Sequence, residues 1–254
     1  MTHWIFLGLT LFLLPSAFLH ADRGVELFLG PEVYGTTRTK EGGAKQTGTL
    51  YGVRLGYERV KRYKFYYALD GLYSEGILEG KNNDRLIRSR FIDSNIETRF
   101  GYTFQSKCFP YLAFTPFFGV GYLWEITKYL HPSPIKVQFE NRFPYIPFGC
   151  LVSFYFRKDI QIGLRFTGRF LWDGKQKVKD PDYGTLTQCY EEYLQYRVEL
   201  PIEYLFCWNN QELSVRLTPF YEYRHYGTGI NFPFDFLDTK FKFYGANIEL
   251  VYYF

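Results

Sequence analysis

Apolar and polar side chains alternate along most of this chain, and this period of two limits the fold more than any other feature. Within the segment 159–172, Leu164 and Phe166 lie on one face of an extended chain, and Arg165 and Thr167 lie on the other. The pattern is equally clear in 194–206 and 212–224, and weaker at 25–34, 49–59, 63–75, 91–104, 109–126, 145–157 and 240–254. It predicts an all-β protein of about ten strands, each with one apolar face.

Almost all charges of these segments fall on the polar face. If the apolar face meets lipid, the polar face lines the inside of a closed barrel, because a charge facing lipid at mid-membrane costs roughly 2–4 kcal/mol. We therefore expect a network of charges in the lumen: Arg54, Glu58, Asp70, Asp93, Glu97, Arg99, Arg165, Arg169, Arg197, Glu199, Glu203, Arg216, Glu222, Arg224 and Glu249, with Glu26, Glu32, Lys64 and Glu125 on the same face. A barrel of this size has little free interior space, so these charges are expected to plug it as ion pairs. A narrow polar pore is the alternative.

The composition favours the same class. Aromatic residues make up 22% of the chain, with 24 Tyr and 27 Phe, while charged residues make up 22%. Membrane β-barrels combine alternating charge with aromatic girdles at both interfaces, whereas helical membrane proteins concentrate their apolar residues. The net charge of +4 is too small to indicate a nucleic-acid partner.

The connections between the expected strands alternate in length. Short links are expected near 60–62, 105–108, 157–159 and 207–211, and long links near 35–48, 76–90, 129–144, 173–192 and 226–239. Short turns on one side and long loops on the other are typical of an up-and-down transmembrane barrel. With both chain ends on the short-turn side, the strand number is even. Ten strands of roughly 10–14 residues fit directly, and eight or twelve are alternatives.

Prolines and one uncharged stretch test this interpretation. The stretch 108–124 carries no charge, but its Pro and Gly residues disfavour a transmembrane helix. Within the expected strands, Pro116, Pro147, Pro201 and Pro219 cannot donate to a β-ladder. We expect them to mark bulges or kinks that face the lumen.

Both ends of the chain resemble those of exported barrel proteins. The apolar run 4–14 is too short for a membrane span and suits a signal peptide, with cleavage after Ala21. The mature domain would then cover 22–254. At the other end, Asn247, Leu250, Tyr252 and Phe254 belong to an alternating strand that ends in Phe. This strand resembles the assembly signal of bacterial outer-membrane β-barrels, although that family usually has Gly where Glu249 stands.

The resemblance is to small outer-membrane barrels of the OmpA-like or Opa-like kind. It implies a location in the cell outer membrane of a Gram-negative bacterium and contact with outer-membrane lipid and lipopolysaccharide. It also implies delivery by the barrel-assembly machinery. An external ligand or host surface would be met through the loops, two of which carry several Lys and Arg residues. Contact with solvent is the default role of such charges.

A catalytic site is not expected. Of the histidines, His131 lies in a long link, and His225 lies near the outer end of a strand, three residues from Glu222. Proteases of the omptin type use an Asp–His dyad and an Asp pair at the outer rim, and no matching motif accompanies either histidine. No metal-ligand cluster and no cofactor-binding motif is present in the sequence.

Four cysteines remain. Cys108 and Cys207 fall in short links, Cys189 in a long link and Cys150 on a strand. Cys108, Cys207 and Cys189 are candidates for a disulfide. A disulfide with a neighbouring protein is favoured over one within the chain, and free thiols are the alternative. Cross-linked, Cys-rich outer membranes are known from chlamydia-like bacteria, to which this composition shows a weak resemblance.

Three functions follow as hypotheses. The first is an integral outer-membrane barrel with a plugged lumen, acting in membrane structure or in surface interaction and adhesion. The second is a narrow porin-like channel for small polar solutes or ions. The third is a rim hydrolase of the omptin or lipid A-modifying type.

Overall fold

The computed structural model describes residues 24–82, 85–105, 111–134, 136–155, 159–181, 184–189, 194–228 and 237–254. The expected signal peptide, 1–21, and Cys108 lie outside these residues. The described chain forms these strands: β1(Val25–Lys40), β2(Lys45–Arg59), β3(Phe65–Asn82), β4(Arg85–Tyr102), β5(Phe104–Gln105), β6(Leu112–Leu130), β7(Gln138–Tyr155), β8(Ile160–Leu171), β9(Lys175–Asp180), β10(Gly184–Cys189), β11(Leu194–Glu199), β12(Ile202–Trp208), β13(Gln211–Tyr226) and β14(Thr239–Tyr253).

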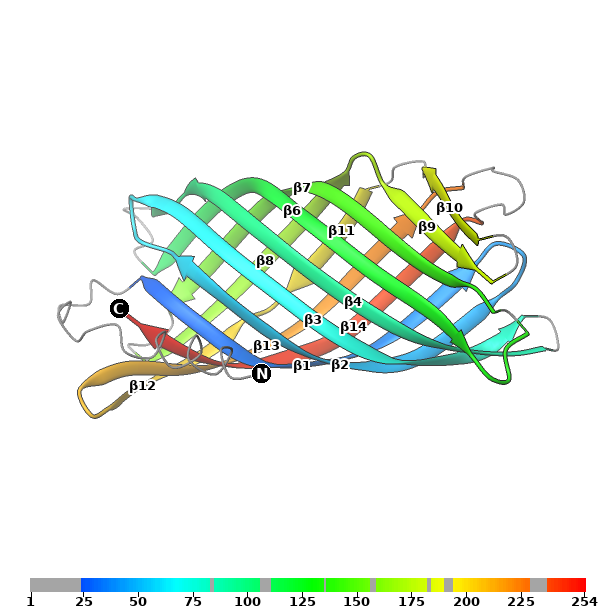
Figure 1. The fold of residues 1–254 in the computed structure, drawn as a ribbon. Coiled ribbons are helices and arrows are strands. Elements are labelled where there is room, and N and C mark those ends of the chain that lie inside the picture. Colours follow the sequence, from blue (N-terminus) through cyan, green and yellow to red (C-terminus); the bar gives the residue numbers. More distant parts are fainter. Residues whose placement is uncertain are drawn as a thin grey trace, which may run out of the picture.

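The strands close into an antiparallel barrel (Figure 1). The first strand, β1, pairs with β2 on one side and with the last strand, β14, on the other. The barrel has ten strands, because β5 continues β4 along β6, and β11 and β12 together fill one position between β8 and β13. The all-β fold, the up-and-down order and the count of ten are therefore confirmed. We call the end where β1 begins and β14 finishes the terminus end, and the other the hairpin end.

The predicted alternation decides which side chains face outward. Leu29, Leu55, Ile248 and Leu250 are each more than half exposed on the outer surface, whereas Glu32, Arg54 and Glu249 on the same strands are buried in the lumen. An exposed belt of this extent would be unstable in water and is what a lipid-facing barrel requires.

Four of the five predicted long loops are wrong in one respect, because most of their length is paired strand; the fifth, 226–239, lies mostly outside the described residues. The link 35–48 is a hairpin in which β1 and β2 stay in register up to Thr39 and Lys45. Likewise β3 and β4 pair to Asn82 and Arg85, and the link 173–192 contains the hairpin β9–β10. β6 reaches 19 residues, beyond the expected length. Past the lipid belt both faces of a strand can be polar, so the alternation disappears while the hydrogen-bonded ladder continues.

The prolines lie in gaps of the ladder. At Pro31 the ladder between β1 and β14 is interrupted: Leu29 pairs with Leu250, and the next pair is Glu32 with Asn247. Two residues are therefore unpaired in this ladder on each of the two strands. The same holds near Pro116, Pro147, Pro201 and Pro219. A bulge would insert an extra residue on one strand only, so the bulge interpretation is wrong. Where the ladder is interrupted, no backbone N–H is required, so a closed barrel can hold prolines at these positions.

From Leu112 to Trp124 the uncharged stretch belongs to the strand β6. Among the described residues, no helix has the length and apolarity to cross a bilayer.

Candidate functional site

The lumen is the candidate site, and its middle layer is a network of ion pairs. Arg54 reaches Glu32 at 2.7 Å and Asp70 at 3.2 Å. Arg165 donates to both carboxylate oxygens of Glu58, at 2.7 and 2.8 Å. Since adjacent inward positions on neighbouring strands lie opposite one another, long Arg side chains reach several carboxylates at once.

Two arginines bridge strands that are far apart in the sequence. On β13, Arg224 donates to Asp93, Glu125 and Glu222, at 2.9, 2.8 and 2.6 Å. Nearer the terminus end of the same strand, Arg216 contacts Glu26, Glu203 and Glu249, at 2.7, 2.8 and 3.6 Å. In each group one guanidinium is shared by three carboxylates.

Buried tyrosines complete the network. Tyr226 donates to Glu125 at 2.6 Å, Tyr66 to Glu58 at 2.6 Å, and Tyr145 to Glu97 at 2.8 Å. Tyr34 donates to Asp93 at 3.0 Å. These neutral donors add hydrogen bonds to carboxylates that arginines already contact.

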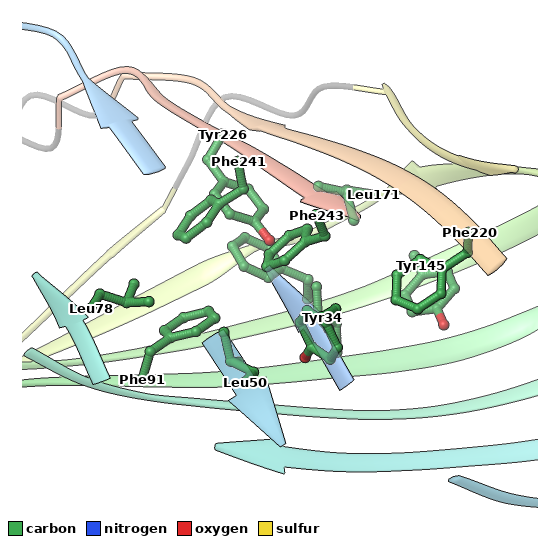
Figure 2. Close-up of a cluster of buried hydrophobic side chains, with 12 residues drawn as sticks. Tyr34, Leu50, Leu78, Phe91, Tyr145, Leu171, Phe220, Tyr226, Phe241 and Phe243 are labelled. Carbon is green, nitrogen blue, oxygen red and sulfur yellow. The ribbon is translucent and has the colours of Figure 1, made fainter. Parts of the chain in front are cut away.

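The lumen towards the hairpin end is filled by an apolar cluster (Figure 2). Its members are Tyr34, Leu50, Leu78, Phe91, Leu123, Phe143, Tyr145, Leu171, Phe220, Tyr226, Phe241 and Phe243. The rings of Phe143 and Tyr226 stack with centroids 4.5 Å apart, and those of Phe241 and Phe243 with centroids 5.5 Å apart. The expectation of a lumen filled by ion pairs alone is therefore incomplete: an aromatic layer closes it above the charges.

A cavity of about 120 Å³ opens below the charged layer, at the terminus end. Its lining includes Glu26, Arg216 and Glu249, together with Gly24 and Tyr253 at the two chain ends of the barrel. A second cavity, of about 10 Å³, lies deeper among Arg54, Asp70 and Glu199. The second cavity holds about one water molecule, so the described side chains leave little free space at this level of the network.

All the charges predicted for the lumen network are buried: Arg54, Glu58, Asp70, Asp93, Glu97, Arg99, Arg165, Arg169, Arg197, Glu199, Glu203, Arg216, Glu222, Arg224 and Glu249. Glu26, Glu32 and Glu125 are buried with them, whereas Lys64 is exposed in the turn between β2 and β3, so its lumen assignment is wrong. The sequence interpretation missed Arg38 and the four buried tyrosines. They lie at inward positions of their strands. Counting every second residue from a predicted lumen charge on the same strand would have identified them.

The rim histidine has a different partner from the one suggested by the sequence. His225 Nε2 lies 2.7 Å from Asp238 Oδ2. Glu222 points into the lumen, whereas His225 lies at an outward position three residues on. His131 is exposed. In the part of the chain that the structure describes, no group of three His, Cys, Asp or Glu side chains is arranged to hold a metal ion.

The three cysteines that the structure describes form no disulfide with one another. Cys189 and Cys207 are exposed free thiols, and Cys150 is a half-buried one. β10, which ends at Cys189, lies at the hairpin end, while the β12–β13 hairpin that holds Cys207 lies at the terminus end (Figure 1). A cross-link with another protein stays a prediction, and Cys108 lies outside the described residues.

The proposed assembly signal forms the end of β14. Leu250 and Phe254 are exposed on the outer surface, and the ring of Phe254 meets that of Tyr252 edge to face with centroids 4.9 Å apart. Asn247 is different, because its side chain is buried in the lumen. Its amide donates to Glu32 at 3.3 Å.

Comparisons with known proteins agree with this architecture. No family model and no curated protein sequence matches the chain. The outer membrane protease OmpT from Escherichia coli has a similar structure, with a TM-score of 0.55 and 11% identity over 92% of this chain and 98% of that chain. The translocator domain of the autotransporter NalP from Neisseria meningitidis gives a TM-score of 0.50 and 10% identity over 99% of this chain and 96% of that chain.

The chain therefore has the fold of bacterial outer-membrane β-barrel proteins. Together with the exposed apolar belt, this fold indicates an integral protein of the outer membrane. From the usual plan of such barrels we expect the terminus end to face the periplasm and the hairpin end to face outward. Neither neighbour supports the resemblance to chlamydia-like bacteria.

Proposed function

We propose that this protein is a closed outer-membrane barrel that acts at its outer surface, in membrane structure or in surface interaction. The observation that carries the proposal is the filled lumen. Arg224 and its three carboxylates span the interior, and the apolar cluster of Phe91, Phe143 and Phe243 closes it towards the outside. Side chains packed in this way leave the outer hairpins as the accessible part.

Single-channel recording of the refolded mature protein in a planar bilayer tests the closed lumen. We expect a silent membrane while the protein is shown to be folded and inserted. Arg165→Ala and Arg169→Ala should lower stability without producing an ion-selective current. Steady, charge-selective openings of the wild-type protein would contradict the proposal and favour a channel.

A basic collar on the outer surface supports lipopolysaccharide as a partner. Beyond the apolar belt, outward positions change to cations: Arg90 on β4, Lys128 on β6, Arg142 on β7, Lys175 on β9 and Lys242 on β14. Arg90, Arg142 and Lys175 are paired with nearby carboxylates, and the hydrogen bond with Asp173 raises the pKa of Lys175. Cations at this level would meet the phosphates of outer-leaflet lipid.

Lys128 and Lys242 are the collar residues to test, since no ion pair joins either of them to a described carboxylate. The double variant Lys128→Gln and Lys242→Gln should weaken binding of the detergent-solubilised protein to purified lipopolysaccharide. Lys64→Gln is the control, because Lys64 is also exposed but lies at the terminus end of the barrel. Equal loss of binding in both proteins would count against the collar.

A narrow channel is the second candidate, favoured by the periplasmic cavity that reaches Arg54 and Glu199. The conductance experiment separates it from the closed barrel.

A rim hydrolase is the third candidate, because OmpT is a protease and His225 contacts Asp238. A rim histidine held by a carboxylate has the components of a general base. The test is hydrolysis of peptide and lipid substrates by the wild-type protein and by His225→Ala. Any activity that survives this substitution removes His225 from the candidate site.

A further inference from the structure

The periplasmic cavity contains a group of charges that do not balance. Arg216 is shared by Glu26, Glu203 and Glu249, so the group has an excess of negative charge. All four side chains line the cavity and are at least nine-tenths buried. A buried carboxylate without a cation is costly, and such a group is stabilised by a bound proton, by a further positive charge or by hydrogen-bond donors.

The hydrogen bonds show which carboxylate lacks a partner. Arg216 donates to both oxygens of Glu26 at 2.7 Å, and its Nε donates to Glu203 at 2.9 Å. Glu203 also accepts from Ser214 at 2.6 Å and from Tyr253. Among the described residues, Glu249 accepts no hydrogen bond: Arg216 approaches it only to 3.6 Å, which is too long, and Arg54 contributes only a longer-range attraction.

Asn247 gives a second and independent indication. It lies two residues before Glu249 on the same lumen face of β14, it lines the same cavity, and its side chain is 1% exposed. Its Nδ2 donates to Glu32, but its Oδ1 has no hydrogen-bond partner among the described residues. A buried amide oxygen without a donor is costly, so a ligand that meets it there should carry an N–H or O–H group.

The cavity leaves space beside these groups. Glu203, Arg216 and Glu249 are direct cross-strand partners on β12, β13 and β14, and all three line the cavity. The cavity of about 120 Å³ far exceeds the volume that one water molecule requires, about 10–15 Å³. It therefore has room for a small molecule.

We propose that this cavity binds a small primary amine from the periplasm, with the ammonium group held by the carboxylate of Glu249 and by Asn247 Oδ1. An ammonium group is compact, carries the missing positive charge and has three N–H donors. The carboxylate of Glu26 or of Glu203 accepts the third. The site also gives a role to Glu249, which stands where related barrels usually have glycine in the last strand.

Isothermal titration of the mature protein, refolded in detergent micelles, with ethylammonium chloride tests the proposal. We expect saturable binding to the wild-type protein and at least about tenfold weaker binding to Glu249→Gln and to Asn247→Ala, since each loses one acceptor. Refolding in vitro avoids dependence on the assembly signal to which Asn247 belongs.

Two controls separate binding from general charge effects. Tetramethylammonium chloride at equal ionic strength carries the same charge without an N–H donor and should not bind. Glu97→Gln changes a buried carboxylate outside the cavity lining and should bind ethylammonium as the wild type does. Absence of binding to the wild type, an unchanged affinity in folded Glu249→Gln, or equal binding of both cations would each overturn the proposal.

Discussion

Arg224 on β13 and Asp93 on β4 form a two-pronged ion pair across the lumen, with two hydrogen bonds of 2.9 Å between residues 131 positions apart in the chain. The same guanidinium also reaches Glu125 and Glu222. Paired geometry of this kind holds a carboxylate in one orientation, so Arg224 ties opposite walls of the barrel together.

Arg224→Ala should strongly destabilise the barrel. The substitution leaves Asp93, Glu125 and Glu222 buried without their shared cation, a loss for which about 3–5 kcal/mol is expected. Urea unfolding of the protein in lipid vesicles, followed by circular dichroism, measures the effect. Arg88→Ala is the control, because Arg88 pairs with Glu79 on the surface with 47% and 66% of the two side chains exposed. That control should lose at most about 1 kcal/mol.

Phe243→Ala should also destabilise the barrel, because it empties the centre of the apolar cluster. Phe243 is 1% exposed, stacks on Phe241 and meets Tyr34 edge to face. Removal of a ring buried in this way costs about 3–5 kcal/mol. The neighbouring Tyr244 is 58% exposed on the outer surface, so Tyr244→Ala should cost less in the same unfolding experiment. If both variants lost the same free energy of unfolding, the buried cluster would stabilise the barrel no more than the exposed outer surface does.

Phe254→Ala should reduce assembly in cells without preventing refolding. The ring is exposed and contacts Tyr252, so its contribution to the stability of the folded barrel is small. Outer-membrane fractions of a Gram-negative host should contain less of the variant, while refolding yields in detergent stay equal to those of the wild type. If both yields fell together, Phe254 would have a structural role and the assembly-signal interpretation would fail.

Labelling of single cysteines tests the orientation. Cys189 at the end of β10 and Cys207 on β12 are both exposed, at opposite ends of the barrel. In intact cells treated with a reductant, a membrane-impermeant maleimide should modify a variant that retains only Cys189. A variant that retains only Cys207 should react only after detergent opens the outer membrane. The reverse result would invert the assigned topology.

The alternation of side chains by itself determined that the chain is a barrel and which residues face its interior. This prediction succeeds because the pleat of a strand and the cost of charge in lipid act on each residue locally. Arg165 and Arg169 could therefore be assigned to the lumen from their own segment. The same local rule could not show how far strands continue beyond lipid, so the link 35–48 was predicted as a loop although it is a hairpin.

Only the tertiary structure decided which residues meet inside. The period of two places Arg224 in the lumen but does not indicate that Asp93, on a distant strand, lies opposite it. Along β14 the apolar residues also change face: Ile248 and Leu250 point outward, whereas Phe241 and Phe243 are buried in the lumen cluster and Lys240 and Lys242 lie outside. The face of a side chain depends on its neighbours in the chain, whereas its partners depend on strand number, tilt and register, which exist only once the sheet has closed.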